Sequence, residues 1–171
     1  MNNQTLLRAA FTQAHAILDE VMADCTPEVL GKQLPAATIG NIGSVYAHAI
    51  FGEDGLVQGM IQGKPPIYEA QGWSGKLGVP MPGPMQNLDW AASVKIDLQA
   101  FGEYAKAVFA ATEAYIAGAS DAEMERSVET GFAGTQPVAQ VLGTIVLWHM
   151  VNHQGEIAAL KGVHGRKGLP F

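Results

Sequence analysis

The sequence has little charge and a single cysteine, and each shortage excludes a class of protein. Charged residues make up 15% of the 171 positions, against about 25% in an ordinary soluble domain. The 10 basic residues are outnumbered by 16 acidic ones and form no run longer than Arg166-Lys167. A protein that binds nucleic acid needs clustered cations to neutralise phosphates, so we expect no nucleic-acid partner. The low surface charge favours an oligomer that hides part of its surface.

Compartment and membrane signals are also missing. Cys25 has no second cysteine with which to form an intramolecular disulfide, which favours a reducing compartment, and we expect its thiol to be buried and unreactive. No window approaches the roughly 18 uncharged apolar residues that a membrane span requires. The N-terminus lacks the basic region and apolar stretch of a secretory signal. The sequence therefore predicts a cytoplasmic protein without a membrane partner.

Apolar residues recur at intervals of three and four in several long segments, which is typical of amphipathic helices. Hydrophobic residues make up 48% of the chain, enough for the core of one domain over residues 1–171. Strand-like alternation is weak, and only 127–132 has room for a short extended piece. The fold class predicted is all-α, an antiparallel four-helix bundle with helices over Leu6–Met22, Thr38–Met60, Asp89–Gly118 and Pro137–Gly162.

Glycine and proline are concentrated in and after the second predicted helix. That helix contains five glycines, each unfavourable by about 1 kcal/mol against alanine, and close approach of a neighbouring helix is the simplest compensation. In 59–84, 11 of the 26 residues are Gly or Pro, so a long loop without regular elements is expected between the second and third helices. Tyr68, Trp73 and Met81 give it apolar side chains for docking. It is either a packed connector or a lid over a pocket, with residues 64–82 covering a substrate.

The fourth predicted helix carries His149 and His153, which lie four residues apart and so share one face. Neutral imidazoles suit Zn, Ni and Fe, and His48, in the middle of the second helix, is the expected third ligand. Three histidines leave coordination positions open, as catalytic sites do. Alone, the pair is equally typical of core histidines held by hydrogen bonds. Position 150 is Met, so the His-Glu-x-x-His motif of zinc proteases is absent.

Other polar residues are weaker candidates for a site. Glu156 lies three residues beyond His153 and extends the polar line, so it is the expected catalytic residue that orients an imidazole or takes a proton. His15 is spaced with apolar neighbours and is left out of the ligand set. Glu53 and Asp54 fall off the helical face of His48, and we expect them on a solvated surface.

The segment Thr38–Gly43 leading to His48, the segment His149–Glu156 and the tail Leu160–Phe171 resemble the DinB-like superfamily. The resemblance implies a four-helix bundle in which His48, His149 and His153 occupy the positions of a metal triad. It also implies a divalent metal cofactor, often zinc or nickel, and frequent dimers. Characterised relatives include thiol-dependent transferases and isomerases that use a low-molecular-weight thiol such as mycothiol or bacillithiol.

Two hypotheses about function follow. In the first, the protein is a metal-dependent enzyme, a thiol-dependent transferase or hydrolase that acts on a small-molecule substrate. In the second, it is a non-catalytic bundle that binds a ligand or a partner and whose histidines are structural. Loss of activity on metal removal distinguishes the first. A metal that only raises thermal stability is the mark of the second.

Overall fold

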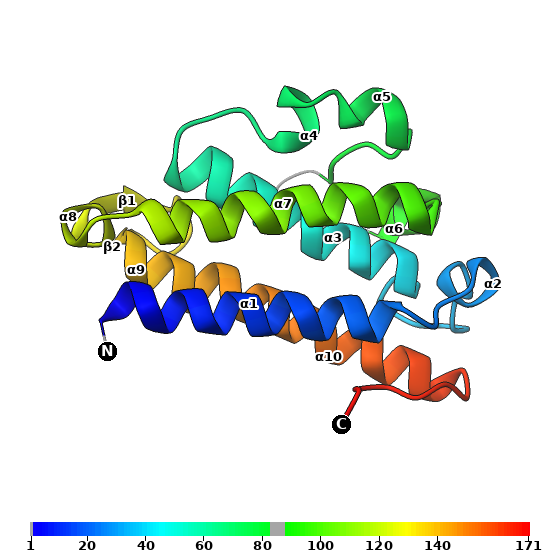
Figure 1. The fold of residues 1–171 in the computed structure, drawn as a ribbon. Helices are drawn as coiled ribbons and strands as arrows, with labels where there is room; N and C mark the ends of the chain where they lie inside the picture. Colours follow the sequence, from blue (N-terminus) through cyan, green and yellow to red (C-terminus); the bar gives the residue numbers. More distant parts are fainter. Residues whose placement is uncertain (1, 83–87) are drawn as a thin grey trace.

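The computed structural model describes residues 2–82 and 88–171 and is mostly helical, as the sequence periodicity predicted (Figure 1). Within these residues, four long helical units run along the molecule. The first unit is α1 (Asn3–Met22), and the second is α3 (Ile42–Asp54) continued by the π-helix η1 (Gly55–Ile61). The third is α7 (Leu98–Gly118), and the fourth joins α9 (Val138–Val141), the π-helix η2 (Leu142–Val146) and α10 (Leu147–Val163). Both α1 and α3 pack against α7 and α10.

The directions of these units correct the expectation of a simple antiparallel order. Gln154 of α10 donates a hydrogen bond to the carbonyl of Ala14 in α1, and Lys161 donates to that of Val21, so α1 and α10 run in the same direction. Figure 1 shows that α3 and α7 are also parallel to each other and opposite to the first pair. The reason is the long connection over 62–97, which takes the chain back to the other end of the bundle before α7 begins.

Two helices start later than predicted because a side chain caps them further along the chain. The side chain of Asn41 accepts a hydrogen bond from the Ser44 amide, so α3 begins at Ile42 rather than near Thr38. The side chain of Asp97 accepts one from the Ala100 amide at the start of α7. Such a cap requires an extended residue, and the single helix expected from Asp89 is therefore divided into α6 (Leu88–Ser93) and α7.

The glycine- and proline-rich segment contains regular structure that we did not expect. It holds the end of η1 and two short helices, α4 (Ile67–Ala70) and α5 (Trp73–Leu77). Gly72 and Gly78 flank α5 and both have positive φ, so these glycines end helices rather than prevent them. Gly83 and Pro84, which were part of the predicted loop, lie outside the described residues.

Residues 65–82 are held against the body of the bundle. The buried Asp54 carboxylate accepts hydrogen bonds from the amides of Ile67 and Tyr68, and the Tyr68 hydroxyl donates to the carbonyl of Val79. The Trp73 ring lies 5.8 Å from the Tyr104 ring of α7, between ring centres. The docking expected from Tyr68 and Trp73 is confirmed, and the segment is mainly a packed connector.

A small hairpin closes one end of the bundle. Strand β1 (Ser127–Glu129) pairs antiparallel with β2 (Thr135–Pro137), and Val128 faces Gln136. The extended piece expected within 127–132 is confirmed, whereas its partner strand was not predicted. Two further short helices, α2 (Pro27–Leu30) and α8 (Asp121–Glu125), complete the part of the chain that the structure describes. Cys25 is buried between α1 and α2, as expected.

Candidate metal centre

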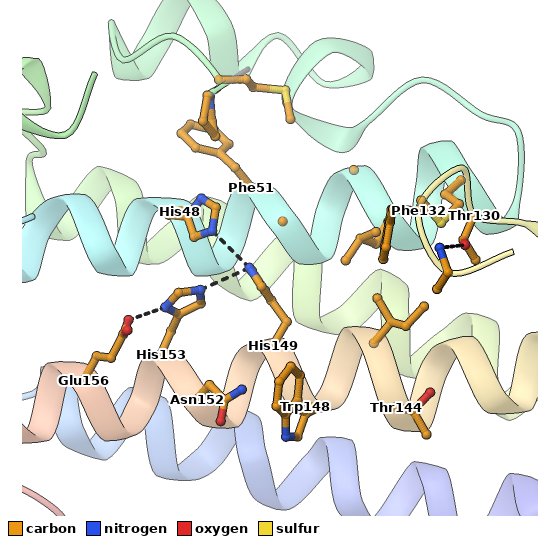
Figure 2. A pocket seen from close by; sticks show the side chains of 18 residues that line it. His48, Phe51, Thr130, Phe132, Thr144, Trp148, His149, Asn152, His153 and Glu156 are labelled. Carbon is orange, nitrogen blue, oxygen red and sulfur yellow. Dashed lines mark hydrogen bonds and ion pairs between the residues drawn. The ribbon is translucent and has the colours of Figure 1, made fainter. Parts of the chain in front are cut away.

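A cavity of about 1240 Å³ lies between the α3–η1 unit and the η2–α10 unit, and the turn of the hairpin closes its far end (Figure 2). Three histidines and Glu156 stand at one end, and Thr130 and Phe132 stand at the other. From the 64–82 segment only Met81 and Pro82 reach the lining, so the expectation that this segment covers the cavity holds for its last residues alone. Concave sites of this kind are where proteins bind small molecules.

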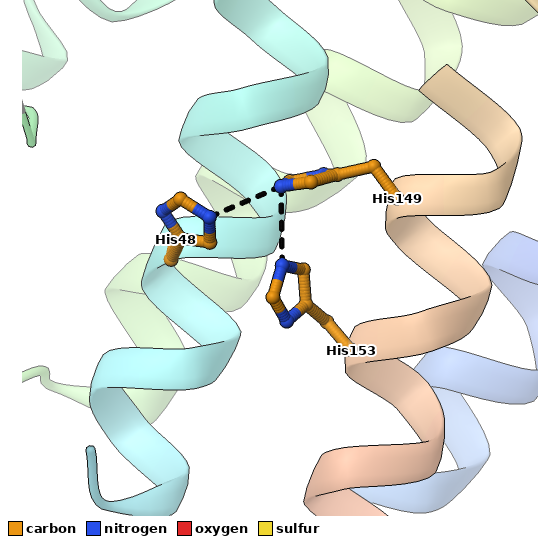
Figure 3. A group of neighbouring side chains, drawn as sticks. All are labelled: His48, His149 and His153. Atoms are coloured by element: carbon orange, nitrogen blue, oxygen red, sulfur yellow. Dashed lines mark hydrogen bonds between the residues drawn. The ribbon is translucent and has the colours of Figure 1, made fainter. Parts of the chain in front are cut away.

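The side chains of His48, His149 and His153 converge on one point (Figure 3). The Nε2 atom of His149 lies 3.1 Å from the Nε2 atom of His48 and 3.1 Å from that of His153. One nitrogen from each ring lies within 4.8 Å of the other two. The structure thus brings together the three residues that the sequence singled out, and their role as metal ligands stays a prediction.

The bundle positions these rings through simple helical geometry. His149 and His153 are one turn apart on α10, and His48 faces them from α3, which runs antiparallel to α10. Gly52 makes room for the His149 ring, because a Cβ atom on this residue would lie 2.4 Å from Cε1 of His149. The Trp90 ring of α6 stands edge-on to His48, with 6.4 Å between ring centres.

Burial keeps two of the imidazoles neutral. It lowers the pKa of His48 to about 4 and that of His149 to about 3, and the nearby His153 further disfavours a positive charge on each. A neutral imidazole has the free lone pair that a metal requires. Both rings are therefore in the ligating form at neutral pH without the loss of a proton.

Glu156 contacts only one of the three rings. Its Oε2 atom lies 2.5 Å from Nδ1 of His153, and since an ionised carboxylate can only accept, the Nδ1–H group donates. This fixes the tautomer in which the Nε2 lone pair of His153 points to the common centre. The Nδ1 atoms of His48 and His149 are buried and have no partner among the described residues, so these rings are oriented by packing and by the contacts among the Nε2 atoms.

Two of the three nitrogen separations fit ligands of a single divalent ion. Two ligand nitrogens at about 2.05 Å from zinc lie about 3.3 Å apart at a tetrahedral angle and about 2.9 Å apart at a right angle. The 3.1 Å separations of His149 from His48 and from His153 lie between these values, and all three nitrogens lie within 4.8 Å of one another. Three neutral imidazoles that face one another are a donor set that suits a transition metal.

Glu53 and Asp54 are fully buried, which contradicts the expectation of a solvated surface. Glu53 lies 3.1 Å from Nε2 of His15, whose Nδ1 atom lies 2.8 Å from Glu113 of α7. Burial lowers the pKa of His15, but its hydrogen bonds to the two glutamates outweigh this effect and raise it. His15 is therefore part of a buried polar cluster between α1, α3 and α7 and does not join the three histidines.

Sequence reasoning missed several residues of the site. The sequence places the small residue Gly52 one turn after His48, but it does not show that the ring beside Gly52 is that of His149. The β1–β2 turn brings Phe132 to the cavity, and Trp148 lines it from the residue next to His149. Trp148 was recognisable from its position beside the histidine pair, but Phe132 depends on the unpredicted hairpin.

A family model described as the DinB superfamily matches residues 10–157. The chain belongs to the DinB superfamily. A crystal structure of a conserved protein from Enterococcus faecalis is similar over 97% of this chain and 99% of that chain, with a TM-score of 0.82 and 19% identity. At this identity the likeness shows the fold alone. No curated protein matches the sequence, and none of the helices in the described residues is long and apolar enough to cross a bilayer.

Proposed function

We propose that this DinB superfamily protein binds a divalent metal through His48, His149 and His153 and is a metal-dependent enzyme of the thiol-transferase or hydrolase kind. The convergence of three Nε2 atoms at the end of a cavity is the observation that carries the proposal. Zinc and nickel are the proposed ions, because both accept neutral imidazole ligands. Three protein ligands leave positions free for water or a substrate.

In this proposal the residues of the chain have separate roles. The bound ion would supply Lewis acidity, which lowers the pKa of a coordinated water or thiol so that the anion exists at neutral pH. Glu156 would hold the proton on Nδ1 of His153 and keep its Nε2 lone pair directed inward. The carboxylate also borders the cavity, where it would take a proton from a small-molecule substrate or a low-molecular-weight thiol. We further propose a cytoplasmic homodimer, in keeping with the low charge content.

Elemental analysis of the untagged protein tests the metal site directly. We expect about one equivalent of zinc or nickel in the parent protein and none in a variant with His48, His149 and His153 all replaced by alanine. A folded parent protein that contains no metal and takes up neither added ion would refute the proposal. Circular dichroism of the triple variant checks that its loss of metal is not a loss of fold.

Activity assays then separate the enzyme from a ligand-binding bundle. The metal-loaded protein is assayed for conjugation of a low-molecular-weight thiol to the electrophile monochlorobimane and for hydrolysis of a chromogenic ester. Activity that disappears with chelation and returns with one ion supports the enzyme. A metal that raises the melting temperature without turnover of either substrate class would indicate the non-catalytic alternative instead.

A further inference from the structure

The cavity continues beyond the histidines as an apolar arm, which we define by Leu56, Met60, Phe132, Ile145 and Trp148. In Figure 2 the histidines lie on one side of the cavity, and the turn that carries Phe132 lies on the other. Apart from the histidines, Glu156 is the one acidic or basic side chain among the described lining residues, and it belongs to the histidine end. The two ends of the cavity therefore differ in chemistry.

The polar groups along the arm are already engaged in hydrogen bonds within the protein. The Thr130 hydroxyl donates to the carbonyl of Gly134 and accepts from the amide of Ala133. The Thr144 hydroxyl donates to the carbonyl of Gln140 in the preceding turn. Both hydroxyl hydrogens are thus used, so the two threonines have no donor left for a polar ligand group.

Phe132 is presented to the cavity by a turn with a defined shape. It lies between Gly131 and Gly134, whose φ angles are +76° and +72°. The two hydrogen bonds of the Thr130 hydroxyl close the same turn. Phe132 nevertheless remains 69% exposed. A large apolar side chain in a well-formed turn, yet open to water at a cavity, is typical of a binding residue rather than a core residue.

Trp148 and the two π-helices complete the arm. The Trp148 side chain is 64% exposed although it lies next to His149. Leu56 and Met60 come from η1, Ile145 comes from η2, and η1 and η2 contact each other. π-Helical turns are rare and occur frequently at functional sites. The wall of the arm is therefore built from irregular helical turns that carry apolar side chains.

We propose that the substrate has an aliphatic or aromatic group that lies in this apolar arm under Phe132 and Trp148, while its polar reacting end reaches the three histidines. The statement about the reacting end rests on the proposed function, whereas the apolar binding site does not need a metal. A small molecule is the occupant favoured over a second copy of the chain. The surface is a concave cavity rather than a flat face, and its volume of about 1240 Å³ leaves room for a small molecule, since common ligand sites have roughly 300–1,000 Å³.

Calorimetric titration of the metal-free protein with n-alkanols from butanol to decanol tests the arm. These probes need no metal, so failure of the proposed function would leave the result unaffected. We expect the affinity to rise about three- to fourfold for each added methylene that becomes buried. Phe132→Ala should weaken binding of the longest alkanols at least fivefold and leave butanol nearly unchanged. Phe171→Ala is the matched control, because Phe171 is 85% exposed and lies outside this cavity.

Three results would overturn the proposal. The first is an alkanol affinity that does not depend on chain length, and the second is a Phe132→Ala variant that binds decanol as tightly as the Phe171→Ala control does. The third is a dimer that the Phe132→Ala substitution dissociates without any change in alkanol binding. The last would identify the surface as an interface between two copies. Titration of the zinc-loaded protein with alkyl hydroxamates of increasing length then tests the link to the histidines. The affinity for a hydroxamate should rise with the length of its alkyl chain and should also depend on the bound zinc. An affinity that rises with chain length but does not depend on zinc would show that the apolar arm is not connected to the site of the three histidines.

Discussion

Replacing Gly52 by alanine should weaken metal binding at the three histidines while the bundle stays folded. The new Cβ atom would lie 2.4 Å from Cε1, 3.1 Å from Nδ1 and 3.2 Å from Nε2 of His149. Non-bonded carbon atoms settle at about 3.5–4.0 Å, so the imidazole has to move by roughly 1 Å. Ligand distances in metal sites vary by only about 0.2 Å, and the displaced ring is lost as a good ligand.

The expected size of the effect follows from that displacement. Disturbing even a residue that only orients a metal ligand lowers metal affinity about 10- to 100-fold, so moving a ligand itself should cost at least as much. The backbone should tolerate the change, because alanine is favoured over glycine in a helix interior by up to about 1 kcal/mol. The loss should therefore appear in zinc affinity rather than in the free energy of unfolding.

Gly55→Ala provides the control from the same helical unit. A Cβ atom at Gly55 meets no atom within 4 Å, and the residue has a helical φ of −63°. Competition with a chromophoric chelator measures zinc affinity in both variants, and urea unfolding verifies their stability. Equal zinc affinity in the folded Gly52→Ala and Gly55→Ala proteins would show that the His149 ring does not need the space at Gly52, and our description of the site would be wrong.

Three further predictions concern single residues. Glu156→Gln should lower zinc affinity about tenfold, because an amide holds the partner imidazole less firmly than a carboxylate; chelator competition measures this, and unchanged affinity would contradict the positioning role. The pKa of His15 is raised above 6.5 on folding, so its stabilisation is complete below about pH 6.5 and is lost as the pH rises through the folded value. The free energy of unfolding should then fall more between pH 6 and 9 in the wild type than in His15→Gln. Urea unfolding at each pH measures this, and an equal fall in both proteins would contradict the prediction. Asp54→Ala leaves two buried amides and a tyrosine hydroxyl without their acceptor and should destabilise the protein by about 3 kcal/mol; a loss below about 1 kcal/mol in urea unfolding would show that water replaces the carboxylate.

The histidine cluster was predictable because helical periodicity alone determines which residues share a face. His149 and His153 lie one turn apart on any straight helix, and the only missing information was which neighbour supplies the third ring. The place of His48 in the middle of the second predicted helix made it the expected third ligand, and the resemblance to a known family agreed with this. The contact between Glu156 and His153 was also predictable, since residues three apart on a helix are neighbours.

The fate of Glu53 and Asp54 was not predictable in the same way. Acidic residues are rarely buried unless they are paired, and their partners come from distant parts of the chain. Glu53 is paired through His15 of α1, and Asp54 binds the amides of α4 and a hydroxyl of α7. A single sequence does not reveal such contacts, so the propensity of a carboxylate for the surface was the best available guide. The division of the third helix at Asp97 likewise depends on a cap that competes with continuation of the helix.

The glycines of the second predicted helix show how one interpretation can hold at some positions and fail at others. We expected them to allow close approach of a neighbouring helix. This holds at Gly52, where a Cβ atom would lie 2.4 Å from His149 of α10, whereas a Cβ atom at Gly55 or Gly59 would meet no atom within 4 Å. Gly52 and Gly55 both line the cavity. A side chain at either position would occupy part of the space between the histidines and the apolar arm. Glycine at these two positions lowers the local stability of the helix, but it keeps that space open. The loss of helix stability is therefore linked to the proposed binding of a ligand in the cavity.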